Sequence, residues 1–199
     1  MVTTDLNQTD LSDKAWELLH ELRLRGFIPA KATTHEAELA EAGLAMVRGQ
    51  NLALTPDGRQ AHALWARLPA GSPEEAVAQE AYQAFLPLNT QLLRICTDWQ
   101  LRPDGSINDH SDAAYDFKVL ERLDRLDERI STLVNKLAEA VPRFSAYPVR
   151  LTAALDKITD DRQWLASPRC DSYHTVWMQM HEDLLTAVGA SREDEPEPE

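Results

Sequence analysis

The stretch that decides the fold is residues 167–189, SPRCDSYHTVWMQMHEDLLTAVG. Its apolar residues recur every three or four positions, as expected for an α-helix with a buried stripe: Tyr173, Val176, Trp177, Met180, Leu184, Ala187 and Val188. Four more residues widen the stripe beyond half of the circumference: His174, Met178, His181 and Leu185. The polar remainder is confined to one narrow side: Thr175, Gln179, Glu182, Asp183 and Thr186. A helix this apolar is usually central in its fold. Pro168 after Ser167 predicts its start, and Gly189 predicts its end.

Length and composition place the chain among ordinary globular proteins. It has 199 residues, of which 43% are hydrophobic, enough for one sizeable core or two smaller ones. No apolar run approaches the roughly 20 residues that a membrane span needs. The first residues, MVTTDLNQTD, resemble no signal peptide. Cys96 and Cys170 are too few for a disulfide scaffold, which favours a reducing compartment. We therefore expect a cytoplasmic protein without a membrane partner.

The charge balance restricts the partners further. The chain carries 33 acidic and 20 basic side chains, a net charge of −13. Such a chain is repelled on average by nucleic acid and by anionic lipid. Any contact with DNA must therefore come from a local basic patch.

The first 68 residues predict a small domain of helices and one hairpin. Helical patterns cover residues 13–27, 34–43 and 59–68. Between the second and third of these, residues 44–47 and 52–55 have the pattern of two short strands. The polar residues 48–51 form the tip between them.

The end of this domain resembles a known family. Residues 54–59, LTPDGR, are similar to the Leu-Thr-Pro-x-Gly-Arg segment that closes the wing in MarR-type winged-helix regulators. Residues 97–116, TDWQLRPDGSINDHSDAAYD, and 171–185, DSYHTVWMQMHEDLL, are similar to segments of actinobacterial proteins of the same kind. The resemblance implies an N-terminal winged-helix-like domain that binds DNA in a transcriptional regulator.

The residues between the first helix and the hairpin depart from that family pattern. A helix-turn-helix needs two helices there, the second lying in the major groove, and residues 28–43 are short for two. This stretch offers Glu36, Glu38 and Glu41 but no Arg, and Lys31 precedes its helix. Base and phosphate contacts are usually made by Arg, Lys, Asn or Gln. Residues 1–68 carry seven basic and nine acidic groups.

The hairpin tip is the remaining candidate for a DNA contact. Arg48, Gln50 and Asn51, with Lys31 nearby, have the side chains needed to reach a minor groove. The alternative is that they form an ordinary solvated hairpin tip.

Residues 72–190 predict a helical bundle after a break at Pro69-Ala70-Gly71. Helices are expected over residues 73–97, 112–140, 147–159 and 167–189. The second has a heptad seam that could pair within the chain or with a second subunit, as in a homodimer: Val119, Leu123, Leu126, Ile130, Leu133, Leu137 and Ala140. The tail, residues 191–199, is acidic and contains proline, which predicts disorder.

A long polar loop, residues 98–112, interrupts the bundle. Loops of this length inside a compact domain are often functional. The other interpretation is that Asp109, Ser111 and Asp112 cap the next helix while Trp99 packs beneath the loop.

Three histidines and a carboxylate are the candidate ligands for a divalent metal or a small molecule. Asp171, His174 and His181 lie at offsets of three and seven along the final helix, and His110 lies in the loop. Imidazole and carboxylate groups suit transition metals. However, seven residues of helix separate two side chains by about 10 Å, too far for one ion. The alternative is that these are core histidines bonded to Asp98, Asp112, Tyr115 or backbone.

Motifs of the common enzyme classes are missing from the sequence: there is no GxSxG, no phosphate-binding GxxxxGK[ST] and no GxGxxG. We therefore expect a mainly α-helical protein with a small β-hairpin that is not an enzyme. The leading hypothesis is a winged-helix transcriptional regulator whose bundle senses a ligand or forms a homodimer. One alternative is an interaction module that keeps a degenerate winged helix and binds a protein partner instead of DNA. A third hypothesis is a metal- or ligand-binding bundle.

Overall fold

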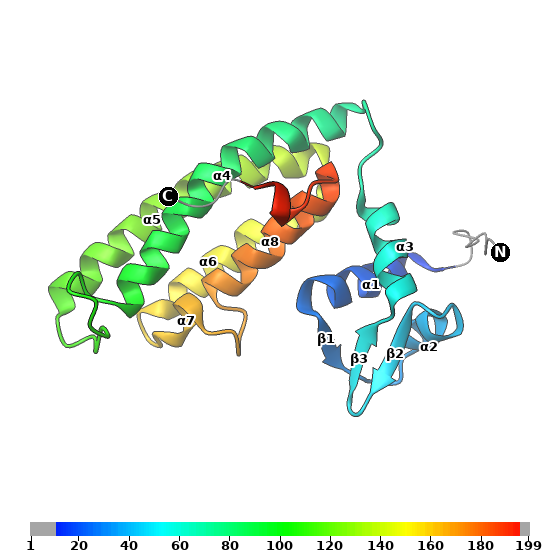
Figure 1. Cartoon of the computed structure of the whole chain (residues 1–199), viewed down its shortest axis with the longest axis horizontal. Coiled ribbons are helices and arrows are strands. Elements are labelled where there is room, and N and C mark those ends of the chain that lie inside the picture. Colours follow the sequence, from blue (N-terminus) through cyan, green and yellow to red (C-terminus); the bar gives the residue numbers. More distant parts are fainter. Residues whose placement is uncertain (1–10, 196–199) are drawn as a thin grey trace. The chain divides into compact units, whose positions relative to one another are not determined.

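The computed structural model describes residues 11–195 of the chain (Figure 1). The fold class expected from the sequence is confirmed: the chain is mainly helical, with a small antiparallel sheet near the N-terminus followed by helices. The chain divides after Arg67 into two compact units.

The first unit consists of helices packed on a three-stranded sheet. Its elements are α1 (Asp13–Arg25), β1 (Phe27–Pro29), α2 (Thr34–Glu41), β2 (Ala45–Arg48), β3 (Asn51–Leu54) and α3 (Pro56–Ala66). The predicted hairpin is present as β2 and β3, which pair antiparallel. The sheet order is β1-β3-β2, so β1 adds to the free edge of β3. The sequence did not predict β1 because three residues ending in proline show no alternation.

A single helix, α2, separates β1 from β2. The first unit therefore lacks the second helix of a helix-turn-helix pair, as the short stretch between residues 28 and 43 predicted. Thr33 caps α2, since its hydroxyl accepts from the backbone N–H of Glu36.

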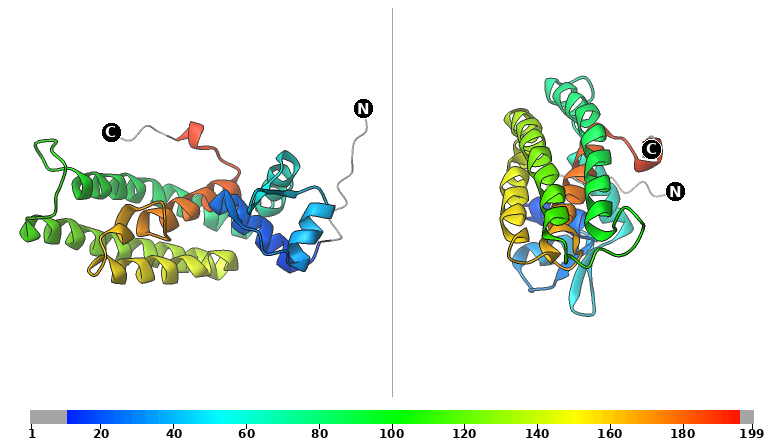
Figure 2. Two further views of the ribbon diagram at one scale, coloured as in Figure 1. Left: turned by 90° about the horizontal axis from the view of Figure 1, so that it is seen from below. Right: turned by 90° about the vertical axis from the view of Figure 1, so that its left-hand side faces the viewer.

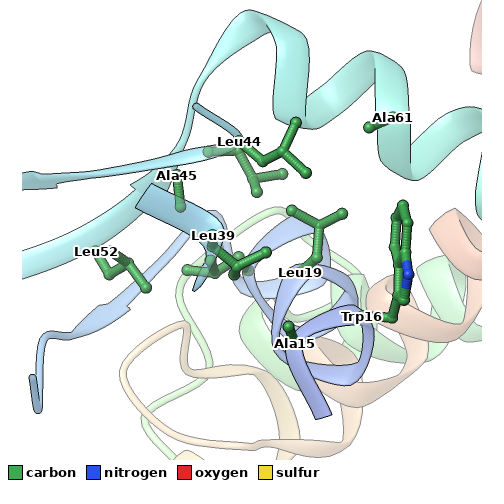
Figure 3. Close-up of a cluster of buried hydrophobic side chains, with 10 residues drawn as sticks. Ala15, Trp16, Leu19, Leu39, Leu44, Ala45, Leu52 and Ala61 are labelled. Atoms are coloured by element: carbon green, nitrogen blue, oxygen red, sulfur yellow. The ribbon is translucent and has the colours of Figure 1, made fainter. Parts of the chain in front are cut away.

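The core of this unit lies between α1, α2 and the sheet (Figure 3). Leu19 and Leu22 of α1 and Leu39 of α2 are fully buried, and Leu52 of β3 is 1% exposed. Full burial of each such side chain contributes about 2 kcal/mol. This apolar cluster is what holds a short sheet and an eight-residue helix together.

The LTPDGR segment joins the sheet to α3. Thr55 caps α3 by accepting from the backbone N–H of Gly58, and its own hydroxyl donates to the carbonyl of Gly43 over 2.6 Å. Pro56 occupies the first turn, where no N–H is needed. These contacts tie the start of α3 to the turn before β2.

The second unit is a helical bundle. Its elements are α4 (Pro73–Gln100), α5 (Ala113–Ala140), the 3-10 helix η1 (Pro142–Ser145), α6 (Ala146–Ile158), α7 (Gln163–Ala166), α8 (Tyr173–Val188) and the 3-10 helix η2 (Arg192–Asp194). Figures 1 and 2 show α4 and α5 side by side, joined at one end by the loop between them. The short helix α7 was not expected as a separate element.

Helix α8 is the central helix, as predicted. It packs on α4, α6 and α7, and none of its residues from Tyr173 to Val188 is exposed. Two residues assigned to its polar side, Gln179 and Asp183, are buried instead. Its start was also wrong: Ser172, not Ser167, is the N-cap, because the Ser172 hydroxyl accepts from the N–H of Thr175.

The seam of α5 is used within the chain. Its buried residues are Val119, Leu123, Leu126, Ile130, Val134 and Leu137. The predicted heptad pattern placed Leu133 where Val134 is buried, so the spacing relaxes to that of a straight helix. Helix α5 packs on α4 and α6 through this seam. The seam is therefore buried within the chain and is not available to a second subunit.

Residues 191–195 differ from the predicted disorder. They contain η2, and Glu195 contacts the bundle through its side chain. Residues 196–199 of the predicted tail lie outside the described part. Within residues 11–195, no helix combines the length and apolarity that crossing a membrane requires.

Candidate functional site

The four residues predicted to contact DNA come together at one end of the sheet. Arg48 and Asn51 are paired in register across the hairpin, and Asn51 also faces Pro29 of β1. The backbone N–H of Ala30 donates to the carbonyl of Gln50 over 2.9 Å. Lys31 follows Ala30 directly, so β1 brings this lysine to the hairpin tip. The pairing of β1 is the tertiary contact that completes the cluster.

These side chains are available to solvent. Lys31, Arg48 and Gln50 are exposed and Asn51 is half-buried. Gly49 has a φ of 63° in the two-residue turn, a conformation that glycine adopts without strain. Below we call Lys31, Arg48, Gln50 and Asn51 the wing-tip cluster.

No carboxylate lies in the strands that carry the wing-tip cluster. Residues 27–31 and 45–54 contain Lys31 and Arg48 and no Asp or Glu. The strands and the turn that carry this cluster therefore contribute two cations and no anion to a chain of net charge −13. This is the kind of local basic patch that an acidic DNA-binding protein requires.

Helix α2 stands where a helix-turn-helix protein would have the helix that contacts bases. Two of its three glutamates have structural roles. The carboxylate of Glu36 is buried and accepts from the backbone N–H groups of Lys31 and Ala32 at 3.0 and 3.1 Å. The carboxylate of Glu38 accepts from the Ser12 hydroxyl over 2.7 Å, and this hydrogen bond lowers the pKa of Glu38. Of the three glutamates of α2, Glu41 is the one that is fully exposed.

The outward side of α2 nevertheless offers nothing that reads bases. Its exposed residues are Thr34, Ala37, Ala40 and Glu41. Sequence-specific contacts in a major groove depend on longer donors such as Arg, Asn or Gln. The side chains of the wing-tip cluster are therefore better suited to contact DNA than those of α2.

The outer face of the sheet also carries exposed apolar side chains. Phe27 and Met46 both face Ala53 in register, and they share a sheet face with Arg48 and Asn51. Phe27 is 61% exposed and Met46 is 39% exposed. The wing-tip cluster therefore borders an apolar strip.

The four candidate ligands in the bundle do not form one site. His110 pairs with Asp116, Asp171 with Arg150 and His181 with Glu195. The Nε2 atom of His174 is buried and has no hydrogen-bond partner among the described residues. Within residues 11–195, no three His, Cys, Asp or Glu side chains are close enough to hold a metal ion. The metal hypothesis therefore gains no support from the described residues.

His110 belongs to a polar cluster under the loop. Its Nδ1 lies 3.0 Å from Asp116 Oδ2, and Asn108 donates to Asp116 Oδ1 over 2.9 Å. The His110 ring packs against Trp99, with ring centroids 4.5 Å apart. Neither Asn108 nor Asp116 was predicted as a partner. Since Asn108 also donates to the Trp99 carbonyl over 3.1 Å, the cluster ties the loop to both long helices.

The expected capping roles in this loop are confirmed for Asp112. Its carboxylate accepts from the backbone N–H groups of Ala114 and Tyr115, both at 3.1 Å. Asp109 accepts instead from the N–H and hydroxyl of Ser111, which lowers its pKa to about 2. Trp99 is 5% exposed, as predicted for a side chain beneath the loop. The loop is thus stabilised by its own polar residues.

A buried ionic cluster on α8 was missed entirely. Asp183, fully buried, accepts from Arg143 Nε over 2.9 Å and from the Tyr147 hydroxyl over 3.1 Å. Burial, reinforced by Asp183, raises the pKa of Tyr147. The available signal was the position of Asp183 beside Leu184 and Leu185, but its partners come from η1 and α6. Only the packing of those elements reveals them.

Compared with models of known protein families, with curated proteins and with solved structures, the chain matches none.

Proposed function

We propose that the protein is a transcriptional regulator that contacts DNA through the wing-tip cluster. The observation that carries this proposal is the gathering of Lys31, Arg48, Gln50 and Asn51 at one end of the sheet, in strands and a turn that contain no Asp or Glu. The closure of the hairpin by LTPDGR supports it, because this segment resembles the one that closes the wing in MarR-type winged-helix regulators.

The mode of binding follows from the side chains available. Lys31 and Arg48 can neutralise phosphates, and an arginine at a hairpin tip suits the negative potential of a narrow minor groove. Because α2 offers no long donor outward, discrimination between sequences rests on groove shape rather than on base edges. We therefore propose weak binding with a preference for A-tract DNA.

Titration of a labelled A-tract duplex, followed by fluorescence anisotropy at low salt, tests this proposal. Arg48→Ala should weaken binding by about tenfold, and the wild-type log–log salt slope should be near −2, since each phosphate contact contributes about −0.9. The matched control is Lys14→Ala, which removes one exposed cation from α1, outside the hairpin. Equal affinities for wild type, Arg48→Ala and Lys14→Ala, or no binding by folded protein, would contradict the proposal.

The second candidate is an interaction module that binds a protein partner. The exposure of Phe27 and Met46 favours it, since adjacent exposed apolar side chains often mark protein contacts. Paired measurements separate the two candidates. If DNA binding is absent and Phe27→Ser abolishes capture of a specific partner while Arg48→Ala does not, the interaction module is the better description.

A further inference from the structure

The chain's own C-terminal segment places a carboxylate against the bundle. One oxygen of Glu195, Oε1, lies 2.6 Å from His181 Nε2 and 2.9 Å from the Tyr82 hydroxyl. The side chains of His181 and Glu195 are 2% and 14% exposed. Tyr82 belongs to α4 and His181 to α8, so two helices distant in sequence converge on one acceptor atom.

The ring of His181 packs on Phe85, which in turn packs on Trp177. The Phe85 ring lies 4.7 Å from that of His181, and the Trp177 ring lies 5.1 Å from Phe85, between centroids. Phe85 and Trp177 are fully buried. Tyr82 and His181 are themselves buried, at 7% and 1% exposed, and a hydrogen bond shielded from water in this way is stronger than one in water.

The donor chemistry selects an anion. An ionised carboxylate only accepts hydrogen bonds, so Nε2 of His181 and the Tyr82 hydroxyl must both donate to it. The other ring nitrogen of His181, Nδ1, is buried without a hydrogen-bond partner among the described residues. If the acceptor were removed and not replaced, His181 would be almost wholly buried and unsatisfied at both nitrogens, which is costly.

Arg192 of the same segment also contacts α8. Arg192 lies 3.5 Å from Glu182, and the Arg192 side chain is 43% exposed. Glu193 is exposed. The carboxylate of Glu195 attaches residues 191–195 to both α4 and α8.

We propose that Tyr82, Phe85 and His181 form a binding site for the carboxylate of a small apolar carboxylic acid, and that Glu195 is its internal occupant. A free acid competes with Glu195 and releases residues 191–195 from the bundle. The site depends only on the bundle, so it stands or falls separately from DNA binding by the first unit.

Benzoate is a suitable probe because it joins a carboxylate to an apolar ring. Its binding to the full chain can be followed by Trp177 fluorescence, with Trp177→Phe identifying the signal. Glu195→Ala should bind benzoate at least about tenfold more tightly than wild type, because an attached competitor acts at high effective concentration. The matched control, Glu193→Ala, removes an exposed carboxylate two residues away and should bind as wild type does. Equal benzoate affinity in wild type and Glu195→Ala would overturn the proposal.

Two further measurements test the assigned donors and the release of the tail. In the Glu195→Ala background, Tyr82→Phe should weaken benzoate binding about tenfold, the usual effect of losing one hydrogen bond to a charged group. Benzamide, which lacks the charge, should bind far more weakly than benzoate. In wild type, benzoate should speed hydrogen exchange of residues 191–195. Equal binding of benzamide and benzoate, or no effect of Tyr82→Phe in a variant with unchanged thermal melting, would contradict the carboxylate site.

Discussion

Gly58 allows the backbone of α3 to pack directly against the turn before β2. A Cβ atom at this position would lie 1.9 Å from the backbone carbonyl oxygen of Leu44, a distance that no adjustment of a side chain relieves. The backbone of α3 approaches the turn before β2 this closely because Thr55 ties both segments together. The glycine of LTPDGR is therefore required by packing, since its φ is not in the left-handed region.

Gly58→Ala should accordingly destabilise the first unit by about 3 kcal/mol or more, since backbone must move to admit the methyl group. Chemical denaturation followed by the fluorescence of Trp16 and Trp65 would measure this. The matched control is Gln60→Ala, an exposed position on the same helix, with an expected change within about 0.5 kcal/mol. A stability of Gly58→Ala equal to that of Gln60→Ala would show that the close approach is wrong.

The ring of His174 makes the stability of the bundle depend on pH. Burial lowers its pKa from the ordinary value near 6.5. The unfolded chain therefore takes up a proton on this ring at a higher pH than the folded chain does. The neutral ring of His174 therefore makes its full contribution to the free energy of unfolding above pH 6.5. This contribution is lost as the pH falls through the lowered pKa.

We expect His174→Phe to reduce the slope of unfolding free energy against pH below 6.5, by at most about 1.4 kcal/mol per pH unit. Urea unfolding at a series of pH values measures this slope. His35→Phe, at a ring that is 41% exposed, is the comparison variant and should leave the slope nearly as in wild type. Some slope should remain in His174→Phe, since burial also lowers the pKa of His181. Unchanged slopes in both variants would count against burial as the cause.

At the scale of elements, α8 is held by polar as well as apolar contacts. Asp183 joins it to η1 through Arg143 and to α6 through Tyr147, and Gln179 accepts from Arg150 of α6 over 2.6 Å. Another polar contact links α8 to α4, where Trp177 Nε1 donates to Asn89 over 3.0 Å. Burying a polar group without a hydrogen bond is costly, and neighbouring elements supply the partners of Asp183, Gln179 and Trp177.

Removal of the Asp183 carboxylate should therefore lower the free energy of unfolding much more than removal of the Glu182 carboxylate. Asp183→Ala leaves the Arg143 guanidinium, whose side chain is 20% exposed, without its carboxylate, and we expect a loss of about 3–5 kcal/mol. Glu182→Ala removes a carboxylate that lies 3.5 Å from a partly exposed arginine, and the expected loss is below about 1 kcal/mol. Thermal melting compares the pair. Similar melting temperatures would mean that Asp183 contributes little to the bundle.

At the scale of the whole molecule, charge is distributed unevenly along the chain. Residues 42–56 contain no Asp or Glu, although the chain as a whole has 33 such residues. This stretch contains Arg48, and the pairing of β1 with β3 adds Lys31 near the same end of the sheet. Because only two cations lie there, the proposed DNA binding is weak and its dependence on salt is shallow.

Much of the fold could be predicted because the signals are local. The stripe from Tyr173 to Val188 predicted a central helix, and the hairpin was predicted by two short apolar runs around a Gly-containing turn. The missed elements carry weak local signals. Three-residue β1 becomes a strand only by pairing with β3, and the start of α8 was misplaced because serines at positions 167 and 172 are both acceptable caps.

The candidate sites were predicted unevenly for a related reason. Residue type alone led to the choice of the wing-tip side chains, because Arg, Lys, Asn and Gln are the usual DNA contacts, and their contact with DNA stays a prediction. The hydrogen-bond partners of the histidines were not predicted. His110 pairs with Asp116 and His181 with Glu195, and neither acid was expected to pair with a histidine. The histidines were identified as notable, but their environment was not.

By itself, the sequence determined the long helices, the central position of α8 and the hairpin between β2 and β3, because these depend on periodicity and capping within a few residues. The tertiary structure alone decided that β1 brings Lys31 to the wing tip. It also decided that Asp183 is buried rather than solvated, and that Glu195 lies on His181. These contacts join residues from separate elements, and a hydrogen bond between distant residues has no periodic pattern in the chain.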